Sequence, residues 1–309
     1  MNPFIKNLSY FLVFFAGIFV LLSIVLFWIP ELIPISELPK DDYSEIYKNK
    51  IIVAGDSRAE RQLDPALLHK YTSSNVINMG QSAHDLYALS KLLLALDLND
   101  KIIIISASSW QLNDGANQSD YFRSESFGDL SFKDKILLYK RDPVSLYQKQ
   151  MQRFLFCLIY RCSIRNFLNH SRTTNSGYEK IVCKNTRGIN SEYFKNHPFY
   201  SHPNLNGVKK KLLVKALENL DSLKSCKIII YNGFVTKTFR AAAKRKGIYD
   251  LERAYDAEMM SLTSKYASIR YISYLDRQDI PDSCFYDPQH LCEAGVPSFT
   301  KIIAGELDK

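Results

Sequence analysis

The chain has 309 residues, 46% of them hydrophobic, and its 40 Lys and Arg outweigh 32 Asp and Glu to give a formal net charge of +8. This size suits one large domain or two small ones with a sizeable core. The basic residues are dispersed and mostly fit helix faces, so the charge favours anionic lipid or an anionic polymer over nucleic acid. The six cysteines include no CxxC pair, which leaves a zinc ribbon and a thioredoxin-type motif without support.

The first predicted element is an N-terminal apolar segment. Residues 10–30 carry no charge and are long enough, at ~1.5 Å per residue, to cross a bilayer as a helix. The alternative is a signal peptide, whose apolar region is usually about 7–15 residues long and ends at a small-residue cleavage site. Here the run ends in Trp28, Pro30 and Glu31. We therefore predict an uncleaved transmembrane helix, with residues 1–31 as a cytoplasmic stub and anchor.

Flanking charges set the orientation of this anchor. Lys6 and the N-terminal amine precede it, and Glu31 and Glu37 are the first charges after it. The positive-inside rule then places the N-terminus in the cytoplasm and the rest of the chain outside, in a periplasm or at the cell surface. Residues 32–50, which are polar and contain prolines, are interpreted as a linker.

From residue 51 onward, short β-rich runs alternate with helical patterns. Continuous Ile and Val runs are typical of strands covered on both faces, and strands separated by helices predict a parallel sheet. We predict a three-layer α/β/α, flavodoxin-like sheet of about five parallel strands, with the functional site at the carboxyl ends of the strands. The expected strands are 51–54, 76–78, 102–106, 227–231 and 269–274, and the expected helices are 64–71, 84–98, 208–224, 237–246, 250–267 and 294–307.

One interval breaks this alternation. Residues 111–207 are rich in Tyr, Phe, Asn, Arg and Ser and show no clear parallel strand. We interpret them as an insertion into a domain of residues 51–309, between the third and fourth strands. An insertion on the side of the site normally forms a lid or a substrate-binding wall.

The first candidate site residue is Ser57, which follows Gly55 and Asp56 at the end of the first predicted strand. All three residues favour turns, so ordinary turn chemistry is one interpretation. The other is a nucleophile held at a strand-to-helix corner, where free backbone N–H groups of the helix face the reaction centre. The second interpretation requires a base and an orienting acid elsewhere in the chain.

Asp287 and His290 can supply these two groups. They lie three residues apart, after the last predicted strand and before the final helix. In a turn, that spacing lets the carboxylate reach Nδ1 of the imidazole while Nε2 faces outward, as in a serine triad. Two backbone donors are candidates for an oxyanion hole: the N–H of Ser57 and the N–H of Gly80, a glycine that follows the second strand and lets the backbone approach a substrate oxygen.

Three motifs stand in this order at these strand ends: Gly-Asp-Ser after the first strand, Asn-x-Gly after the second, and Asp-x-x-His-Leu before the last helix. Together they resemble the sequence blocks of the SGNH (GDSL-type) hydrolase superfamily. The organisation matches over residues 51–309, with identity of motif only at the three blocks. The resemblance implies that Ser57 is the nucleophile, that Asp287 and His290 complete the triad, and that Gly80 donates to the oxyanion. It implies a serine acyl hydrolase or O-acyltransferase without a cofactor, and no metal site is expected.

The chain departs from this family at its third block. There the family usually has Gly-x-Asn, and the Asn side chain adds an oxyanion donor. This chain has Ser-Ala-Ser-Ser-Trp instead, and its register places Ser108 where the Asn belongs, with Ser109 or Asn113 as alternatives. A missing donor costs about 3 kcal/mol of transition-state stabilisation, so the hole is either weak or completed by another group.

With its altered third block and its predicted anchor, the chain resembles one branch of the family. This branch consists of membrane-tethered proteins that modify cell-surface polymers, such as the D-alanyl transfer protein of teichoic acids and the acetyltransferases of alginate-type polysaccharides. This implies a membrane-bound O-acyltransferase as partner and a cell-surface glycan or acyl ester as substrate. A stand-alone membrane-tethered esterase or lipase is one alternative. A non-catalytic scaffold that binds a glycan or a partner is another.

Three further features stay open at the level of sequence. Arg58 either lines the site as a substrate-binding residue or forms a surface ion pair. Trp110 either stacks on a sugar ring or packs in the core. An extracytoplasmic domain could form disulfides, but the pairing of the six cysteines cannot be deduced from their spacing.

Overall fold

The computed structural model describes residues 44–80, 85–113, 130–134, 178–183 and 205–307, apart from 97, 132 and 224, together with residues 7, 9–15, 17, 18 and 21 near the N-terminus. The chain divides into two compact units, Met1–Pro34 with Phe122–Ser171 and Ile35–Tyr121 with Arg172–Lys309. The sheet and the candidate site belong to the second unit.

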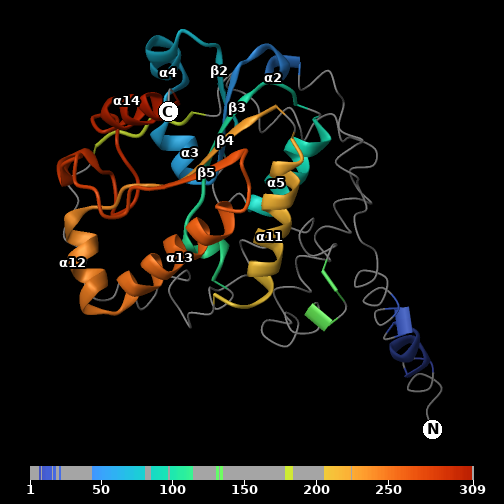
Figure 1. The fold of residues 1–309 in the computed structure, drawn as a ribbon. Coiled ribbons are helices and arrows are strands. Elements are labelled where there is room, and N and C mark those ends of the chain that lie inside the picture. The colour runs from blue at the N-terminus through green and yellow to red at the C-terminus, as the bar shows by residue number, and fades with distance from the viewer. Residues whose placement is uncertain are drawn as a thin grey trace. The chain divides into compact units, whose positions relative to one another are not determined.

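The second unit is built on a five-stranded sheet whose strands are all parallel, in the order β2-β1-β3-β4-β5 (Figure 1). This order is that of flavodoxin-like sheets, and it confirms the prediction of a parallel α/β fold with about five strands. The strands are β1 (Ile51–Gly55), β2 (Val76–Asn78), β3 (Ile102–Ser106), β4 (Lys227–Asn232) and β5 (Ile269–Ser273).

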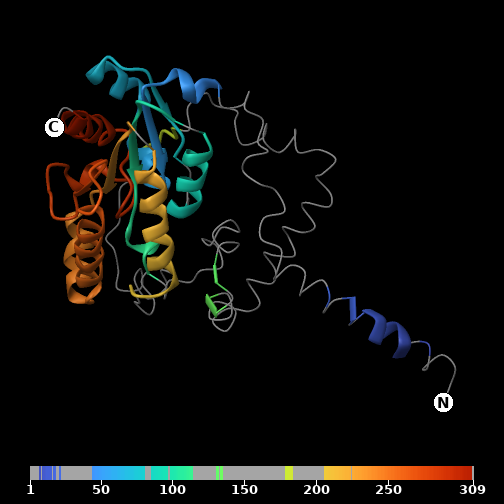
Figure 2. The ribbon, with the colours of Figure 1, turned by 45° about the vertical axis from the view of Figure 1, so that its right-hand side comes forward.

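Helices cover both faces of this sheet. Figure 2 shows α5 and α11, which pack against each other, on one side of the strands and α14 on the other. The helices α3 and α4 contact α14 and therefore share its face. The described helices of this unit are α2 (Ser44–Lys48), α3 (Ser57–Gln62), α4 (Pro65–Thr72), α5 (Leu86–Ala95), α11 (Val208–Asp221), α12 (Lys237–Arg245), α13 (Ile248–Thr263) and α14 (Val296–Leu307), with short 3-10 turns η3 (Ser109–Gln111) and η4 (Asp282–Cys284).

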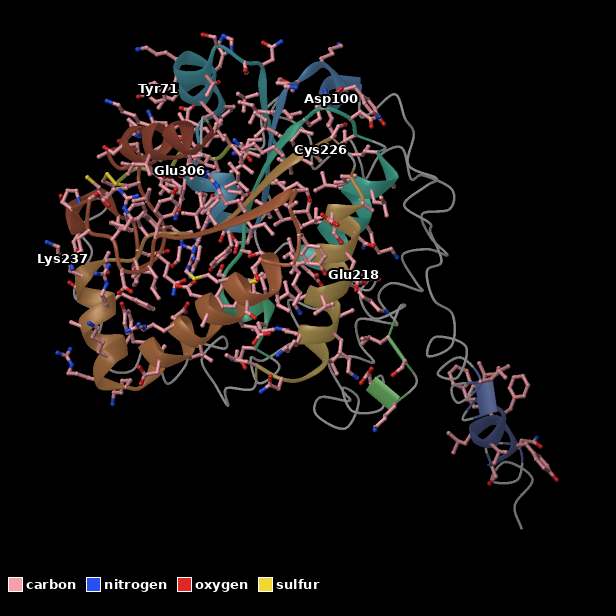
Figure 3. All side chains as sticks on the ribbon, viewed as in Figure 1. Tyr71, Asp100, Glu218, Cys226, Lys237 and Glu306 are labelled. Atoms are coloured by element: carbon pink, nitrogen blue, oxygen red, sulfur yellow. A yellow bond between two sulfur atoms is a disulfide. The ribbon has the colours of Figure 1, made fainter. Side chains whose placement is uncertain are left out.

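The expected helices are therefore present, with ends that differ by a few residues. Side-chain caps mark several of the starts: Asp56, Asp64, Asp85 and Thr236 each accept a hydrogen bond from a backbone N–H in the first turn of α3, α4, α5 and α12. Charged side chains such as Glu218 on α11 and Lys237 on α12 lie exposed on the outer side of their helices (Figure 3). This pattern leaves the apolar faces of the helices for the sheet.

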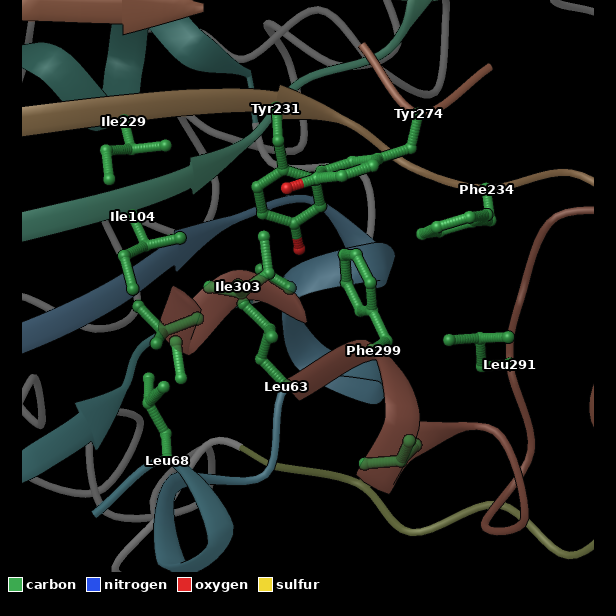
Figure 4. Close-up of a cluster of buried hydrophobic side chains, with 14 of the residues drawn as sticks. Leu63, Leu68, Ile104, Ile229, Tyr231, Phe234, Tyr274, Leu291, Phe299 and Ile303 are labelled. Carbon is green, nitrogen blue, oxygen red and sulfur yellow. The ribbon is translucent and has the colours of Figure 1, made fainter. Parts of the chain in front are cut away.

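An aromatic cluster fills the core between the sheet and α14. Phe299 of α14 is fully buried and meets the rings of Tyr231, Phe234 and Tyr274 edge-on, with centroids 5.4, 5.5 and 5.6 Å away (Figure 4). Phe234 and Tyr274 stack at 5.0 Å. Offset and edge-on ring pairs stabilise beyond the area they bury, so this cluster fixes α14 to the carboxyl half of β4 and the segment after β5.

Part of the predicted organisation lies outside the described residues. Among the residues that the structure describes, no helix is long and apolar enough to cross a membrane. The expected span, residues 10–30, lies largely outside them, so the anchor stays a prediction. Most of the expected insertion, 111–207, is likewise outside. Within the expected linker, 32–50, the final residues form α2, and Ile46 is buried.

Replacing Phe299 by Ala should lower the free energy of unfolding by about 3–5 kcal/mol, because it removes the shared partner of three buried rings and leaves a cavity. Chemical denaturation of the full chain measures this loss. Met260, which is 52% exposed on α13, supplies the matched control, and Met260→Ala should change the same quantity by less than about 0.5 kcal/mol. Equal effects of the two substitutions would contradict the assigned core.

Candidate active site

The candidate site lies at the carboxyl edge of the sheet, near the switch point between β1 and β3. Ser57 begins α3 directly after β1, and Asn232 ends β4. Asp287 and His290 lie between β5 and α14. Asp100 and Cys226, which precede β3 and β4, mark the opposite, amino edge in Figure 3. Ligands of open parallel sheets bind at the carboxyl edge, beside such a switch point.

The structure brings Ser57, His290 and Asp287 together in one hydrogen-bonded chain. Ser57 Oγ lies 2.7 Å from His290 Nε2, and His290 Nδ1 lies 2.7 Å from Asp287 Oδ2. The side chains of His290 and Asp287 are 19% and 34% exposed, so the chain is partly shielded but open to solvent.

The ionisation of Asp287 determines which ring nitrogen of His290 carries the proton. Burial raises the pKa of this carboxyl group. Its hydrogen bond to His290, the electrostatic attraction between the two groups and two backbone N–H groups lower the pKa by more, so the net pKa lies below the ordinary value. The ionised carboxylate therefore accepts from Nδ1–H of His290, which leaves Nε2 as an acceptor for the Ser57 hydroxyl. This arrangement can remove a proton from Ser57 Oγ.

A tight hairpin carries the acid and the base. Asp287 Oδ1 accepts from the backbone N–H of Gln289 and of His290, both at 2.8 Å. Tyr286 N–H donates to the His290 carbonyl at 2.8 Å. One carboxylate thus forms the turn with one oxygen and orients the imidazole with the other.

The Gly55-Asp56-Ser57 stretch is a corner held by its acid. Gly55 has φ +117°, and a Cβ there would lie 2.4 Å from the Ser106 carbonyl oxygen, so only glycine fits. Asp56 is the N-cap of α3 and accepts from Arg58 N–H at 3.0 Å and from the Ser106 hydroxyl at 2.7 Å. Asp56 therefore fixes the direction in which α3, and Ser57 with it, leaves the strand.

The predicted oxyanion donors differ in their availability. Among the described residues no hydrogen-bond partner is found for the Ser57 N–H, which fits a donor to substrate. The Gly80 N–H donates to Asn78 Oδ1 at 2.8 Å. A Cβ on Gly80 would lie 2.3 Å from the backbone nitrogen of Glu60, so the glycine is required for close packing on α3.

The residues expected at the third block are engaged elsewhere. The Ser108 hydroxyl donates to Asp56 Oδ2, and the Ser109 hydroxyl donates to Glu252 Oε1 at 2.7 Å. A hydroxyl has one proton, so neither can donate to an oxyanion while these bonds last. Asn113 is fully buried. A third donor from this block stays a prediction that the observed hydrogen bonds do not favour.

Arg58 and Trp110 are both buried, at 3% and 5% exposure. The alternative that Arg58 forms an ion pair at the surface is therefore wrong, because the side chain is buried. Its guanidinium donates to Asn232 Oδ1 and to Gln289 Oε1. Trp110 lies in η3, where Lys209 Nζ donates to its carbonyl oxygen and stands 5.4 Å from the ring centroid. This is the core-packing alternative, and a sugar-stacking role stays an untested prediction.

Asn232 and Gln289 are not among the site residues predicted from the sequence. Asn232 is 1% exposed and follows a buried Ile run at the carboxyl end of a strand, which is the signal that could have found it. Gln289 is 8% exposed and sits inside the Asp287–His290 spacing. The triad prediction depends only on the three-residue spacing of Asp287 and His290, and this spacing gives no role to Gln289.

Residues 178–183 lie against α3 and against the loop after His290. Glu179 N–H donates to the Glu60 carbonyl at 2.9 Å, and its carboxylate accepts from Arg61 Nε at 2.8 Å. At the other end, the Ile181 carbonyl accepts from Glu293 N–H at 2.8 Å. This strap, residues 178–183, therefore connects the nucleophile helix to the segment that follows the base.

A disulfide closes the strap. Cys183 bonds to Cys292, which lies 109 residues away in sequence and two residues after His290. In the described part of the chain Cys226 and Cys284 are free, while Cys157 and Cys162 lie outside it. Within the same described residues, no three His, Cys, Asp or Glu side chains are grouped so as to hold a metal ion.

Comparison with known proteins does not establish a family. No family model and no curated protein matches the chain. A solved structure from Streptococcus pneumonia, provisionally described as a platelet activating factor, is similar with a TM-score of 0.43 and 12% identity, covering 86% of this chain and 87% of that chain. A TM-score this low decides neither fold nor activity, so the chemistry of the site rests on its own geometry.

The depressed pKa of Asp287 predicts an acid-dependent contribution to stability. The ionised carboxylate stabilises the fold above its unfolded pKa of about 3.9, and this is lost as pH falls through the lower folded pKa. The difference in unfolding free energy between wild type and Asp287→Asn should therefore be full near neutral pH and shrink below about pH 4. Denaturant titrations at several pH values measure it. A difference that persists unchanged into acid would contradict the assignment.

Removing the disulfide with Cys183→Ala should lower the free energy of unfolding by about 2–4 kcal/mol, because the unfolded chain is no longer closed into a long loop. Reduction should bring the wild type to the level of the variant and leave the variant unchanged, which denaturant titrations with and without reductant measure. Cys284→Ala, which alters a free thiol, is the control and should keep the sensitivity to reductant.

Proposed function

We propose that the protein is a serine esterase or O-acyltransferase of the SGNH type that acts through an acyl-Ser57 intermediate. The hydrogen-bonded chain from Ser57 Oγ through His290 to Asp287 carries this proposal. Its three members occupy the carboxyl edge of a parallel sheet, where such sheets place their ligands.

In the proposed first step Ser57 Oγ attacks the carbonyl carbon of an acyl ester and its proton passes to His290 Nε2. Asp287 stabilises the imidazolium that forms. The developing oxyanion faces the Ser57 N–H, with the Gly80 N–H as second donor. The tetrahedral intermediate then expels the alcohol, which takes the proton from His290 and leaves the acyl group on Ser57.

In the second step a hydroxyl group attacks the carbonyl carbon of the acyl-enzyme and passes its proton to His290 Nε2. The bond from that carbon to Ser57 Oγ then breaks, and Ser57 Oγ takes the proton back from His290. Water gives hydrolysis, and a sugar hydroxyl gives acyl transfer. The predicted anchor and extracytoplasmic orientation favour transfer to a cell-surface polysaccharide, with a membrane-bound O-acyltransferase as the acyl supplier. Dispersed positive charge, +8 over the chain, is compatible with an anionic polymer.

A second candidate is a scaffold that keeps the fold and binds a glycan or a partner without catalysis. One observation favours the scaffold. The Gly80 N–H donates to Asn78 and the Ser108 hydroxyl donates to Asp56. Of these three predicted oxyanion donors, only the Ser57 N–H is therefore available to a substrate.

A fluorophosphonate probe on the full chain distinguishes these candidates. The wild type should be labelled at Ser57, because the probe reports a serine activated by its base. Ser57→Ala should abolish labelling and His290→Ala should slow it by at least about a thousandfold. Ser261→Ala, which changes an exposed serine of α13, should label as the wild type does.

A folded wild type that stays unlabelled would overturn the proposed enzyme and leave the scaffold. If labelling succeeds, incubation with an acyl ester and a polysaccharide acceptor separates hydrolysis from transfer. Acyl groups recovered on the polysaccharide support transfer, and free acid alone supports the esterase.

A further inference from the structure

The short helix that carries Ser57 also holds the turn that carries His290. Arg58 and Gln62 of α3 are 3% and 0% exposed and lie four residues apart, on one face of the helix. Arg58 Nη2 donates to Gln289 Oε1 at 3.1 Å, and Gln62 Nε2 donates to the Gln289 carbonyl oxygen at 2.7 Å. The residue before the base is therefore bound at its side chain and at its backbone.

The guanidinium of Arg58 is itself held in place. Its Nη1 donates to Asn232 Oδ1 at 2.5 Å, and Asn232 Nδ2 donates to Asp256 Oδ1 at 3.0 Å. The Asn232 amide thus stands between a cation and a carboxylate, with its oxygen toward the first and its nitrogen toward the second. Asp256 also accepts from the hydroxyls of Tyr271 and Ser273. Such a satisfied buried network is rigid.

Gly233, the residue after β4, leaves room for both α3 side chains. A Cβ at this position would lie 3.1 Å from Arg58 Cδ and 3.2 Å from Gln62 Oε1. These contacts are tighter than a side-chain carbon normally makes. The glycine therefore leaves room beside the end of β4 for the side chains of Arg58 and Gln62.

We propose that Arg58 is a positioning residue for the Ser57–His290 pair, rather than a substrate-binding residue. Through Gln289 it fixes the turn relative to α3 and so sets the 2.7 Å separation between Ser57 Oγ and His290 Nε2. Within the described part of the chain, the hydrogen bonds given above for its guanidinium go to Asn232 and Gln289 and not to Ser57 Oγ or His290 Nε2. Its catalytic consequence rests on the function proposed above, whereas its effect on the turn does not.

The expected effect is moderate. A displacement of ~1 Å between reacting groups can cost about a hundredfold in rate. Here the turn keeps other anchors when the Arg58 bond is lost, among them the two hydrogen bonds to Asp287 Oδ1 and the bond from Thr236 N–H to the Pro288 carbonyl oxygen. A loss of about tenfold in labelling rate is therefore expected, within that ceiling.

The proposal is tested by comparing the wild-type full chain with two variants, Gln289→Met and Gln289→Glu. Gln289→Met keeps the size of the side chain and removes the acceptor, whereas Gln289→Glu keeps an acceptor that can pair with the guanidinium. Gln289→Met should be labelled by the fluorophosphonate about tenfold more slowly than wild type, and with an ester substrate the loss should fall on kcat rather than on KM. Gln289→Glu should stay within about threefold of wild type. A Met variant that reacts like wild type would overturn the proposal.

Hydrogen exchange supplies a readout that does not depend on activity. Backbone amides of residues 286–292 should exchange faster in Gln289→Met than in wild type, while those of β3 stay unchanged. If the wild type is not labelled at all, the proposed function fails, and the exchange rates still decide the positioning role. Unchanged exchange at residues 286–292 in Gln289→Met would overturn it.

Discussion

The carboxyl group of Asp56 lies buried at the end of β1 and accepts hydrogen bonds from the Ser106 hydroxyl, the Ser108 hydroxyl and the Arg58 N–H. A buried carboxyl group is costly unless its oxygens find donors, so the chain after β3 must stay where these two serines reach it. Ser106 also accepts from the backbone N–H groups of Asp56 and Ala59. The corner between β1 and α3 is therefore fixed to the neighbouring strand, and the place of Ser57 follows from that.

The partner of Ser57 comes from a segment 233 residues further along the chain. Contacts of such separation need several independent attachments, because each one opposes the entropy of closing a long loop. Among the residues that the structure describes, three such attachments are the hydrogen bonds from α3 to Gln289, the bond from Thr236 to Pro288, and the strap with its disulfide to Cys292. The strap arises within the segment expected to be an insertion, so that segment contributes to the support of the site.

The strands and the triad geometry could be predicted because they depend on local pattern and on topology. Runs of Ile end in polar corners, parallel strands bring their carboxyl ends to one edge, and a three-residue spacing lets Asp287 reach the ring of His290. The fate of Ser108 could not be predicted in this way. Its position in the sequence matches that of an oxyanion donor in the family it resembles. Its hydroxyl has a single proton, however, and donates it to Asp56, which follows a different strand, β1. The burial of Arg58 likewise depends on Asn232 and Gly233, which are distant in sequence. Disulfide pairing has no local signature at all, and the anchor stays a prediction.

In the proposed reaction, Asn78 Oδ1 and the substrate oxygen compete as acceptors for the Gly80 N–H. Asn78 uses its amide nitrogen to bond the Ala59 and Leu63 carbonyls and its oxygen to accept from the Gly80 N–H. A neutral amide oxygen receives a hydrogen bond worth about 1 kcal/mol net, whereas bonds to charged groups are worth about 1.5–3 kcal/mol. In the proposed reaction, the oxyanion that forms on the substrate carbonyl oxygen when Ser57 attacks would therefore be the stronger acceptor for the same N–H. The ester carbonyl, which is neutral, has no such advantage over Asn78. A donor that turns from Asn78 to the substrate only as charge develops would bind the transition state in preference to the ground state, which is the condition for catalysis.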